Sequence, residues 1–148
     1  MCIVIDACCA DDAVGGKFGQ GRLILDWVKS GGRVVTGGKL ELELKGTSLQ
    51  RLLVQWSRAG RLQTISQKRI DEETALIDLS KVKSNDLHVL ALCRASGAKV
   101  VVTRDNDLKK DLKKSGQALR GQKIYPFPTV DVPNLRVQRG VLNNAGCR

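Results

Sequence analysis

The stretch SNDLHVLALCRASGAKVVVTRDNDL, residues 84–108, carries the strongest secondary-structure signal in the chain. Its first half predicts an amphipathic helix that Ser84-Asn85 can cap. The helix is expected to end at Gly97, because glycine readily adopts the left-handed conformation that commonly follows a helix. Residues 99–103 (KVVVT) then form the clearest strand of the chain. A basic helix is expected over 107–114. This succession of helix, strand and helix is typical of an α/β protein.

Strands and helices continue to alternate on both sides of this stretch. Further strands are predicted at 2–6, 33–36, 61–66 and 123–126, and further helices at 22–30, 39–45, 49–59 and 68–78. Glycines between residues 11 and 21 predict a loop. The alternation implies a central, mostly parallel sheet with right-handed crossovers and helices on both faces. We expect one domain over 1–126, followed by a basic tail, 127–148, that ends loosely; disorder, RNA binding and partner binding all stay open for this tail.

The composition fits a folded domain with an aliphatic core. Of the 148 residues, 42% are hydrophobic and only 3% are aromatic. A chain of this length is long enough for one domain with a core of its own. The shortage of aromatic side chains argues against proteins that stack bases on exposed aromatic platforms. Leu, Ile and Val must therefore provide most of the packing.

The chain carries a large excess of positive charge. Its 25 basic and 15 acidic residues give a formal net charge of +10. Such an excess favours polyanionic partners, because neutralised phosphates release their counterions, although a basic protein without such a partner can have the same composition. Four lysines follow Asp105 within one predicted helix, namely Lys109, Lys110, Lys113 and Lys114. They are candidates for holding RNA, and a solvated helix face is the open alternative.

The cysteine and histidine content argues against a zinc site. Five cysteines occur without a CxxC pair, at positions 2, 8, 9, 93 and 147, and His88 is the only histidine. A site of the Cys/His type therefore has almost no ligands to draw on. The chain shows no secretory signal and no apolar stretch near the ~20 residues of a membrane span. We expect a reduced, cytoplasmic protein with no membrane contact.

Three aspartates are expected to meet at one edge of the sheet. Asp6 closes the first strand and Asp105 lies two residues beyond the strand at 99–103, so both point to the edge where parallel strands end. Asp86 lies in the first turn of the preceding helix, where stabilisation of the helix dipole is the simpler explanation. Crowded carboxylates repel one another unless a divalent cation lies among them. Oxygen ligands without histidine or thiolate suit Mg²⁺ or Mn²⁺.

The same pieces of sequence resemble the PIN-domain family. The similar pieces are residues 2–7 (CIVIDA), 84–108 and, more loosely, 37–44 (GGKLELEL). The resemblance implies a three-layer α/β/α fold around a parallel sheet, covering residues 1–126. It also implies a hydrolase that cleaves single-stranded RNA with Mg²⁺ or Mn²⁺ as cofactor. Many family members are VapC-type toxins that an antitoxin peptide holds inactive, others process RNA without such a partner, and members often form homodimers.

By this resemblance, the candidate site consists of acids with a supporting threonine. The catalytic set is Asp6, Glu43, Asp86 and Asp105; the metal ligands are Asp6, Asp86, Asp105 and Asp107; the supporting residue is Thr103. Glu41 remains the alternative to Glu43, because residues two apart lie about 200° apart on a helix and only one can face the site. Asp107 can instead cap the basic helix. Gly37-Gly38 departs from the serine or threonine that often precedes this helix in VapC toxins.

Two functions follow as hypotheses. The first is a metal-dependent endoribonuclease in which a carboxylate-bound cation activates water. The alternative is a catalytically idle PIN-like module that only binds RNA or a protein. Residues 32–39 resemble a phosphate-binding P-loop, but the spacing is one residue too long and Leu40 stands where a serine or threonine is needed. His88, two residues after Asp86, is interpreted as a surface or packing residue.

Overall fold

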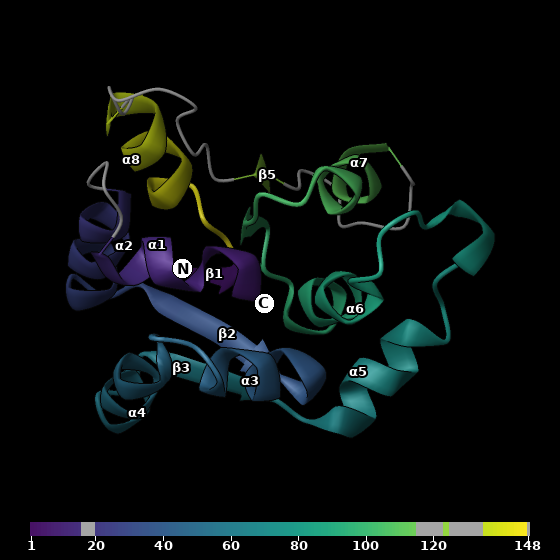
Figure 1. Ribbon diagram of the computed structural model, residues 1–148, viewed down its shortest axis with the longest axis horizontal. Coiled ribbons are helices and arrows are strands. Elements are labelled where there is room, and N and C mark those ends of the chain that lie inside the picture. Colours follow the sequence, from purple (N-terminus) through teal and green to yellow (C-terminus); the bar gives the residue numbers. More distant parts are fainter. Residues whose placement is uncertain (16–19, 115–122, 125–134, 148) are drawn as a thin grey trace.

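In the computed structural model, which describes residues 1–15, 20–114, 123–124 and 135–147, helices surround a five-stranded sheet (Figure 1). The strands are β1 (Cys2–Ile5), β2 (Arg33–Gly37), β3 (Leu62–Ile65), β4 (Val100–Val102) and β5 (Lys123–Ile124). The α-helices are α1 (Ala10–Gly15), α2 (Gln20–Lys29), α3 (Gly38–Lys45), α4 (Gln50–Arg58), α5 (Gln67–Thr74), α6 (Leu87–Ser96), α7 (Asn106–Lys114) and α8 (Leu135–Asn143), with short 3₁₀ turns η1 (Ala7–Cys9) and η2 (Leu79–Lys81). Every strand pairing is parallel, in the order β3-β2-β1-β4-β5.

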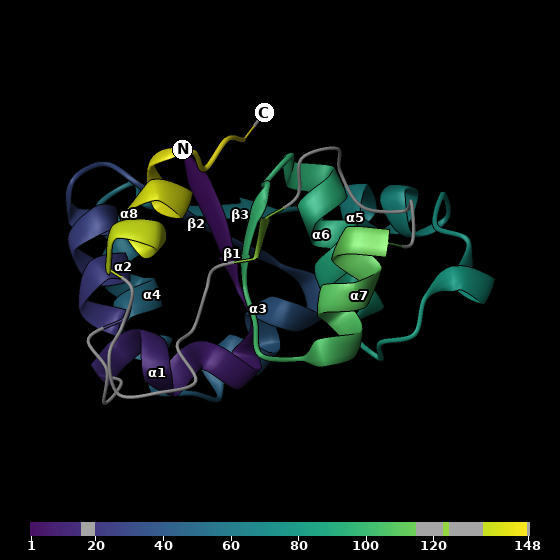
Figure 2. The same cartoon turned by 90° about the horizontal axis from the view of Figure 1, so that it is seen from above.

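The sheet lies between two layers of helices, so the predicted three-layer α/β/α arrangement is confirmed. Figure 2 shows α1, α2, α4 and α8 on one side of the strands and α5, α6 and α7 on the other. Right-handed crossovers explain this division, because the chain moves from β1 through β2 to β3 and then returns past β1 to β4. The carboxyl ends of β1 and β4 therefore lie at one edge of the sheet, close to α3.

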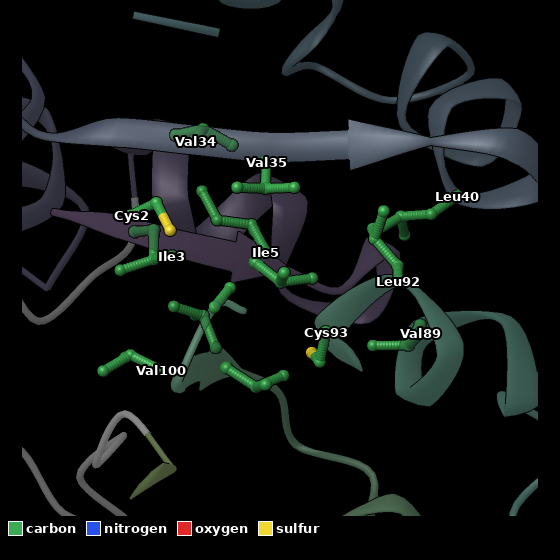
Figure 3. Close-up of a cluster of buried hydrophobic side chains, with 14 of the residues drawn as sticks. Cys2, Ile3, Ile5, Val34, Val35, Leu40, Val89, Leu92, Cys93 and Val100 are labelled. Carbon is green, nitrogen blue, oxygen red and sulfur yellow. The ribbon is translucent and has the colours of Figure 1, made fainter. Parts of the chain in front are cut away.

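The core is aliphatic, as the composition predicts. All four residues of β1 are buried, which is expected of a central parallel strand that helices cover on both faces. Figure 3 shows part of this core, where Val89, Leu92 and Cys93 of α6 belong to the same buried cluster as the side chains of β1 and β2. Each helix in the described part of the chain is too short or too polar to cross a membrane.

The loop predicted between residues 11 and 21 is wrong in its first part, where the chain forms α1. Ala13 is completely buried. The backbone of α1 also approaches Gly21 of α2 so closely that a Cβ at this position would lie 2.5 Å from the carbonyl oxygen of Asp12. Gly21 therefore permits two helices to pack closely, and does not mark a turn.

Residues 135–147 pack against the rest of the protein, which the sequence does not suggest. Helix α8 packs beside α2 (Figures 1 and 2). Leu142 and Ala145 are buried in the core cluster. The expectation of a loose end is thus wrong for residues 135–147. The predicted boundary between residues 126 and 127, and the second half of the strand predicted at 123–126, lie outside the described residues.

Candidate active site

Asp6 lies immediately after β1, at the carboxyl edge of the sheet. Its backbone N–H donates to the carbonyl oxygen of Val102 at 2.9 Å, which continues the pairing of β1 with β4. The residue is only 4% exposed. Its Oδ2 accepts hydrogen bonds from the Thr103 hydroxyl at 2.6 Å and from the Cys8 thiol at 3.0 Å. Asp6 is therefore a buried carboxylate whose orientation is set by neighbouring side chains.

Thr103 links Asp6 to Asp105. The Thr103 hydroxyl that donates to Asp6 also accepts the backbone N–H of Asp105 at 3.1 Å. Asp105 in turn accepts the backbone N–H of Leu108 with its Oδ1 and so caps the first turn of α7. The threonine predicted to be a supporting residue thus lies between two of the candidate acids.

Asp86 is the last residue before α6, and its side chain makes no capping bond to that helix. Its carbonyl oxygen accepts the backbone N–H of Val89 at 2.9 Å, so the helix begins at this residue and the cap predicted at Ser84-Asn85 is wrong. Burial raises the pKa of the Asp86 carboxyl, and the negative charges of Asp6, Asp105 and Glu43 raise it further, while His88 lowers it. Asp86 is therefore near enough to each of the other three candidate acids to interact with it electrostatically.

Helix α3 places Glu43, and not Glu41, in the surroundings of Asp86. Glu43 Oε2 lies 3.0 Å from Nε2 of His88, and Oε1 lies 3.4 Å from Nζ of Lys39. Glu41 pairs with Lys45 at 2.7 Å instead. It lines a separate cavity of about 360 Å³ between α3, α4 and β3, which none of the four candidate acids lines.

His88 has a partner that its position in the sequence did not indicate. Its side chain is 13% exposed and reaches from α6 to Glu43 on α3. The interpretation as a surface or packing residue misses this contact. The pair depends on the packing of α6 against α3, and no local pattern in the sequence reports such packing.

Two glycines direct the chain from β2 into α3. Gly38 has φ +53°, a left-handed conformation that glycine adopts without strain. A Cβ at Gly37 would lie 2.5 Å from the carbonyl oxygen of Ile65 at the end of β3. The departure from the serine or threonine of VapC toxins thus has a physical reason here, and the two glycines set where the Glu43 helix begins.

The remaining candidates lie on α7. Asp107 is exposed and pairs with Lys110 at 2.7 Å, and this bond lowers the pKa of the Asp107 carboxyl. The cap of α7 is Asp105 and not Asp107. Among the lysines proposed to bind RNA, Lys110 and Lys113 are exposed, Lys109 is half-buried, and the side chain of Lys114 lies outside the described residues.

The acids suit a hard divalent cation by their chemistry, without forming a ready-made cage for one. In the part of the chain that the structure describes, no group of three or more His, Cys, Asp or Glu side chains is close enough to hold a metal ion. The donor set is nevertheless all oxygen, as Mg²⁺ and Mn²⁺ prefer. The raised pKa of Asp86 also reflects a repulsion among carboxylates that a cation would relieve.

A comparison with known families agrees with these features. Residues 33–111 match the family model of the PIN domain. Since the match covers more than half of the chain, the protein belongs to the PIN-domain family. The matched region runs from β2 into α7 and includes Glu43, Asp86 and Asp105. PIN domains are usually nucleases, generally use divalent metal ions and act on RNA. No curated protein matches the chain significantly, and neither does any solved structure.

Proposed function

We propose that the protein is a divalent-metal-dependent endoribonuclease that cleaves single-stranded RNA. Its catalytic residues in this proposal are Asp6, Glu43, Asp86 and Asp105. The observation that carries this proposal is the placement of Asp6 and Asp105 at the carboxyl edge of the sheet, joined through Thr103, with Asp86 near enough for their charges to raise its pKa. Gathering these groups is unfavourable without a positive charge among them, because each carboxylate makes the next harder to ionise. Binding a cation at the edge of the sheet supplies such a charge.

In this proposal, Asp6, Asp86 and Asp105 are the ligands of Mg²⁺ or Mn²⁺. When bound, the cation supplies activation of water and shields the charge that builds on the phosphate. Thr103 holds the Asp6 carboxylate and the Asp105 backbone together. Glu43 completes the cluster from α3, where His88 and Lys39 restrain it. Because Asp107 pairs with Lys110, we leave it out of the ligand set.

The substrate strand would lie along α7. This helix starts at the Asp105 cap and exposes Lys110 and Lys113, while Leu108 and Leu112 are buried. Lysines on that face can contact phosphates next to the acid cluster, and their charge offsets the repulsion between the acids and RNA.

Cleavage of labelled single-stranded RNA by the purified protein with Mn²⁺ tests the proposal. We expect Asp86→Asn and Glu43→Gln each to slow cleavage by about 100-fold or more, a loss of about 2.7 kcal/mol in transition-state stabilisation. Glu41→Gln is the matched control, since it makes the same change two residues away on the same helix, and it should cleave like the wild type. Cleavage that survives both EDTA and Asp86→Asn would contradict the proposal.

A second candidate function is a catalytically idle PIN-like module that binds RNA or a protein. It is favoured by the engagement of Glu43 with His88 and Lys39. This module would bind RNA with a steep salt dependence and would not cleave it. Cleavage that Asp6→Asn abolishes while RNA binding stays intact would exclude it.

An antitoxin peptide and a second copy of the chain are further hypotheses for partners. PIN nucleases are often part of toxin–antitoxin systems. Growth arrest on expression, relieved by a co-expressed neighbouring small protein, would support a toxin, and harmless expression of an active enzyme would count against one. Light scattering tests for a homodimer. The five free cysteines agree with a reducing, cytoplasmic location.

A further inference from the structure

Asp111 is a buried acid that is not a member of the candidate catalytic set. It lies in the middle of α7 and is 2% exposed. The backbone N–H of Lys83 lies 3.0 Å from Oδ1 and 3.1 Å from Oδ2, and the backbone N–H of Ser84 donates to Oδ2 at 2.8 Å. A single carboxylate thus binds two successive amides of the segment that leads into α6.

This segment determines where Asp86 lies. Ser84 is two residues before Asp86, and the connection from η2 contains no further helix or strand. Asp86 uses only its backbone carbonyl to start α6, since its carboxylate makes no capping bond. Its position therefore depends on how the preceding backbone is held. Val82 packs against the core, and the described hydrogen bonds that join this backbone to another element are those to Asp111.

The same helix also holds Asp105. Asp105 caps the first turn of α7 through Leu108, and Leu108 and Leu112 anchor the helix in the core. Asp111 lies six residues further along, or about 9 Å along a rigid helix at 1.5 Å per residue. Helix α7 lies beside α6 in both views of the molecule (Figures 1 and 2). Helix α7 thus holds Asp105 at its own first turn and, through Asp111, also holds the Lys83–Ser84 backbone that precedes Asp86.

We propose that Asp111 is a positioning residue of the acid site, which fixes the separation of Asp86 and Asp105 by clamping the Lys83–Ser84 backbone to α7. The inference rests on the proposed function, because it concerns the ability of these two aspartates to bind a cation together. A merely structural clamp would stabilise the fold and leave the affinity of the folded protein for a cation unchanged.

Asp111→Asn is the informative variant, because it keeps the shape and replaces one acceptor oxygen with an NH₂ donor. The negative charge is lost, the single remaining oxygen has to accept from both backbone N–H groups, and the new NH₂ group lies against one of these donors. We expect the affinity of the folded protein for Mn²⁺, measured by calorimetry, to fall by about tenfold, as is usual when support behind a ligand is removed. Asp78→Asn is the matched control, since Asp78 accepts bonds from Ser80 at η2 in the same connection and loses the same charge. Its Mn²⁺ affinity should stay within twofold of the wild type.

A second measurement uses the wild-type protein alone. Because binding couplings are reciprocal, a cation that needs the clamp must also strengthen it. Saturating Mg²⁺ should therefore slow hydrogen exchange of the Lys83 and Ser84 amides by about tenfold or more, if they open locally. This measurement decides the matter should Asp111→Asn fail to fold.

The outcomes separate the inference from the proposed function. If wild-type protein neither binds Mn²⁺ nor cleaves RNA, the proposed function fails and the inference falls with it. If the wild type does both and folded Asp111→Asn binds Mn²⁺ equally well, only the inference is overturned, even where the variant melts earlier. The inference is also overturned if Asp78→Asn weakens Mn²⁺ binding as much as Asp111→Asn does. Should Asp111→Asn not fold, the inference is overturned if Mg²⁺ leaves the hydrogen exchange of the Lys83 and Ser84 amides unchanged.

Discussion

The ionised carboxylate of Asp86 is destabilised by its burial and by the other acids of the candidate site. Burial and the charges of Asp6, Asp105 and Glu43 raise its pKa above the usual 3.8. The ionised carboxylate is thus less stable in the folded protein than in the unfolded chain, and folding stability falls as the pH rises from 3.8 through the folded-state pKa. Above that pKa the cost is fully present, and well below 3.8 it is absent because the carboxyl is protonated in both states.

Asp86→Asn should therefore stabilise the cation-free protein while it abolishes the proposed RNA cleavage. In EDTA at neutral pH we expect the melting temperature to rise by roughly 1–3 °C, and the gain should vanish as the pH falls toward 3.8. Thermal melts across this pH range provide the measurement. Asp71→Asn on α5, which removes an exposed charge, serves as the control. A gain of the same size at acidic and neutral pH would contradict the electrostatic explanation.

Thr103 offers a second prediction for a single side chain. Thr103→Val keeps the shape of the residue but removes the donor to the buried Asp6 carboxylate. We expect the free energy of unfolding to fall by about 1–3 kcal/mol, the cost of leaving a buried acceptor short of a partner. Urea denaturation measures this loss, and RNA cleavage should slow about tenfold or more. Thr103→Ser retains the hydroxyl and should recover most of both properties; if it behaves like the valine variant, the hydrogen bond is not the cause.

The sequence could place some of these residues but not their supports. Asp6 and Asp105 follow apolar strands, so the geometry of a parallel sheet predicts that they share an edge. The preference for Glu43 over Glu41 depends on the resemblance, and the structure separates the two by their partners. The roles of His88 and Asp111 escape the sequence because their contacts join elements that are distant along the chain. A histidine two residues from an aspartate, or an acid within a run of lysines, has no pattern that reveals such contacts.

At the scale of elements, strands are easier to predict than caps and the shortest helix. The central strands β1, β2 and β4 are apolar runs that the sheet buries, so their signal is local. Helix α1 has only six residues and cannot be stable by itself, so it depends on packing against α2. The sequence predicts the start of α6 too early, because serine and asparagine are strong helix caps. In the structure the backbone N–H of Ser84 donates to Asp111 instead, and α6 begins after Asp86.

Helix α7 carries the prediction about RNA binding. Its exposed lysines, Lys110 and Lys113, lie opposite a buried face, so replacing them should not disturb the core. In the double variant Lys110→Ala/Lys113→Ala we expect weaker binding of single-stranded RNA and a shallower salt dependence. The slope of log affinity against log salt should fall by about 0.7 for each phosphate that a lysine no longer neutralises.

Fluorescence anisotropy over a range of salt concentrations measures this slope. The matched control is Lys29→Ala/Lys68→Ala, which removes two exposed lysines from α2 and α5. Equal losses of affinity in both double variants would mean that RNA responds to the total charge of the protein, and that α7 has no special part in binding.

For the whole molecule, the net charge of +10 and the acid cluster would have complementary roles in the proposed function. A uniformly basic protein attracts RNA but has no group to hold a cation, and an acidic pocket alone repels the phosphate backbone. Four acids gathered at one edge of a basic molecule combine both properties. The fold makes this possible because parallel strands bring Asp6 and Asp105 from positions 99 residues apart in the sequence to the same edge.

Whether α8 unfolds together with the rest of the protein can be tested by substitutions in this helix. Leu142 is 2% exposed and belongs to the core cluster, whereas Val137 on the same helix is 48% exposed. If α8 is part of one cooperative unit, Leu142→Ala should lower the free energy of unfolding by about 2–4 kcal/mol. Val137→Ala should change it by less than about 0.5 kcal/mol. Urea denaturation gives both values, and equal small effects would mean that the cooperative unit ends before α8, as the sequence-based boundary at residue 126 implies.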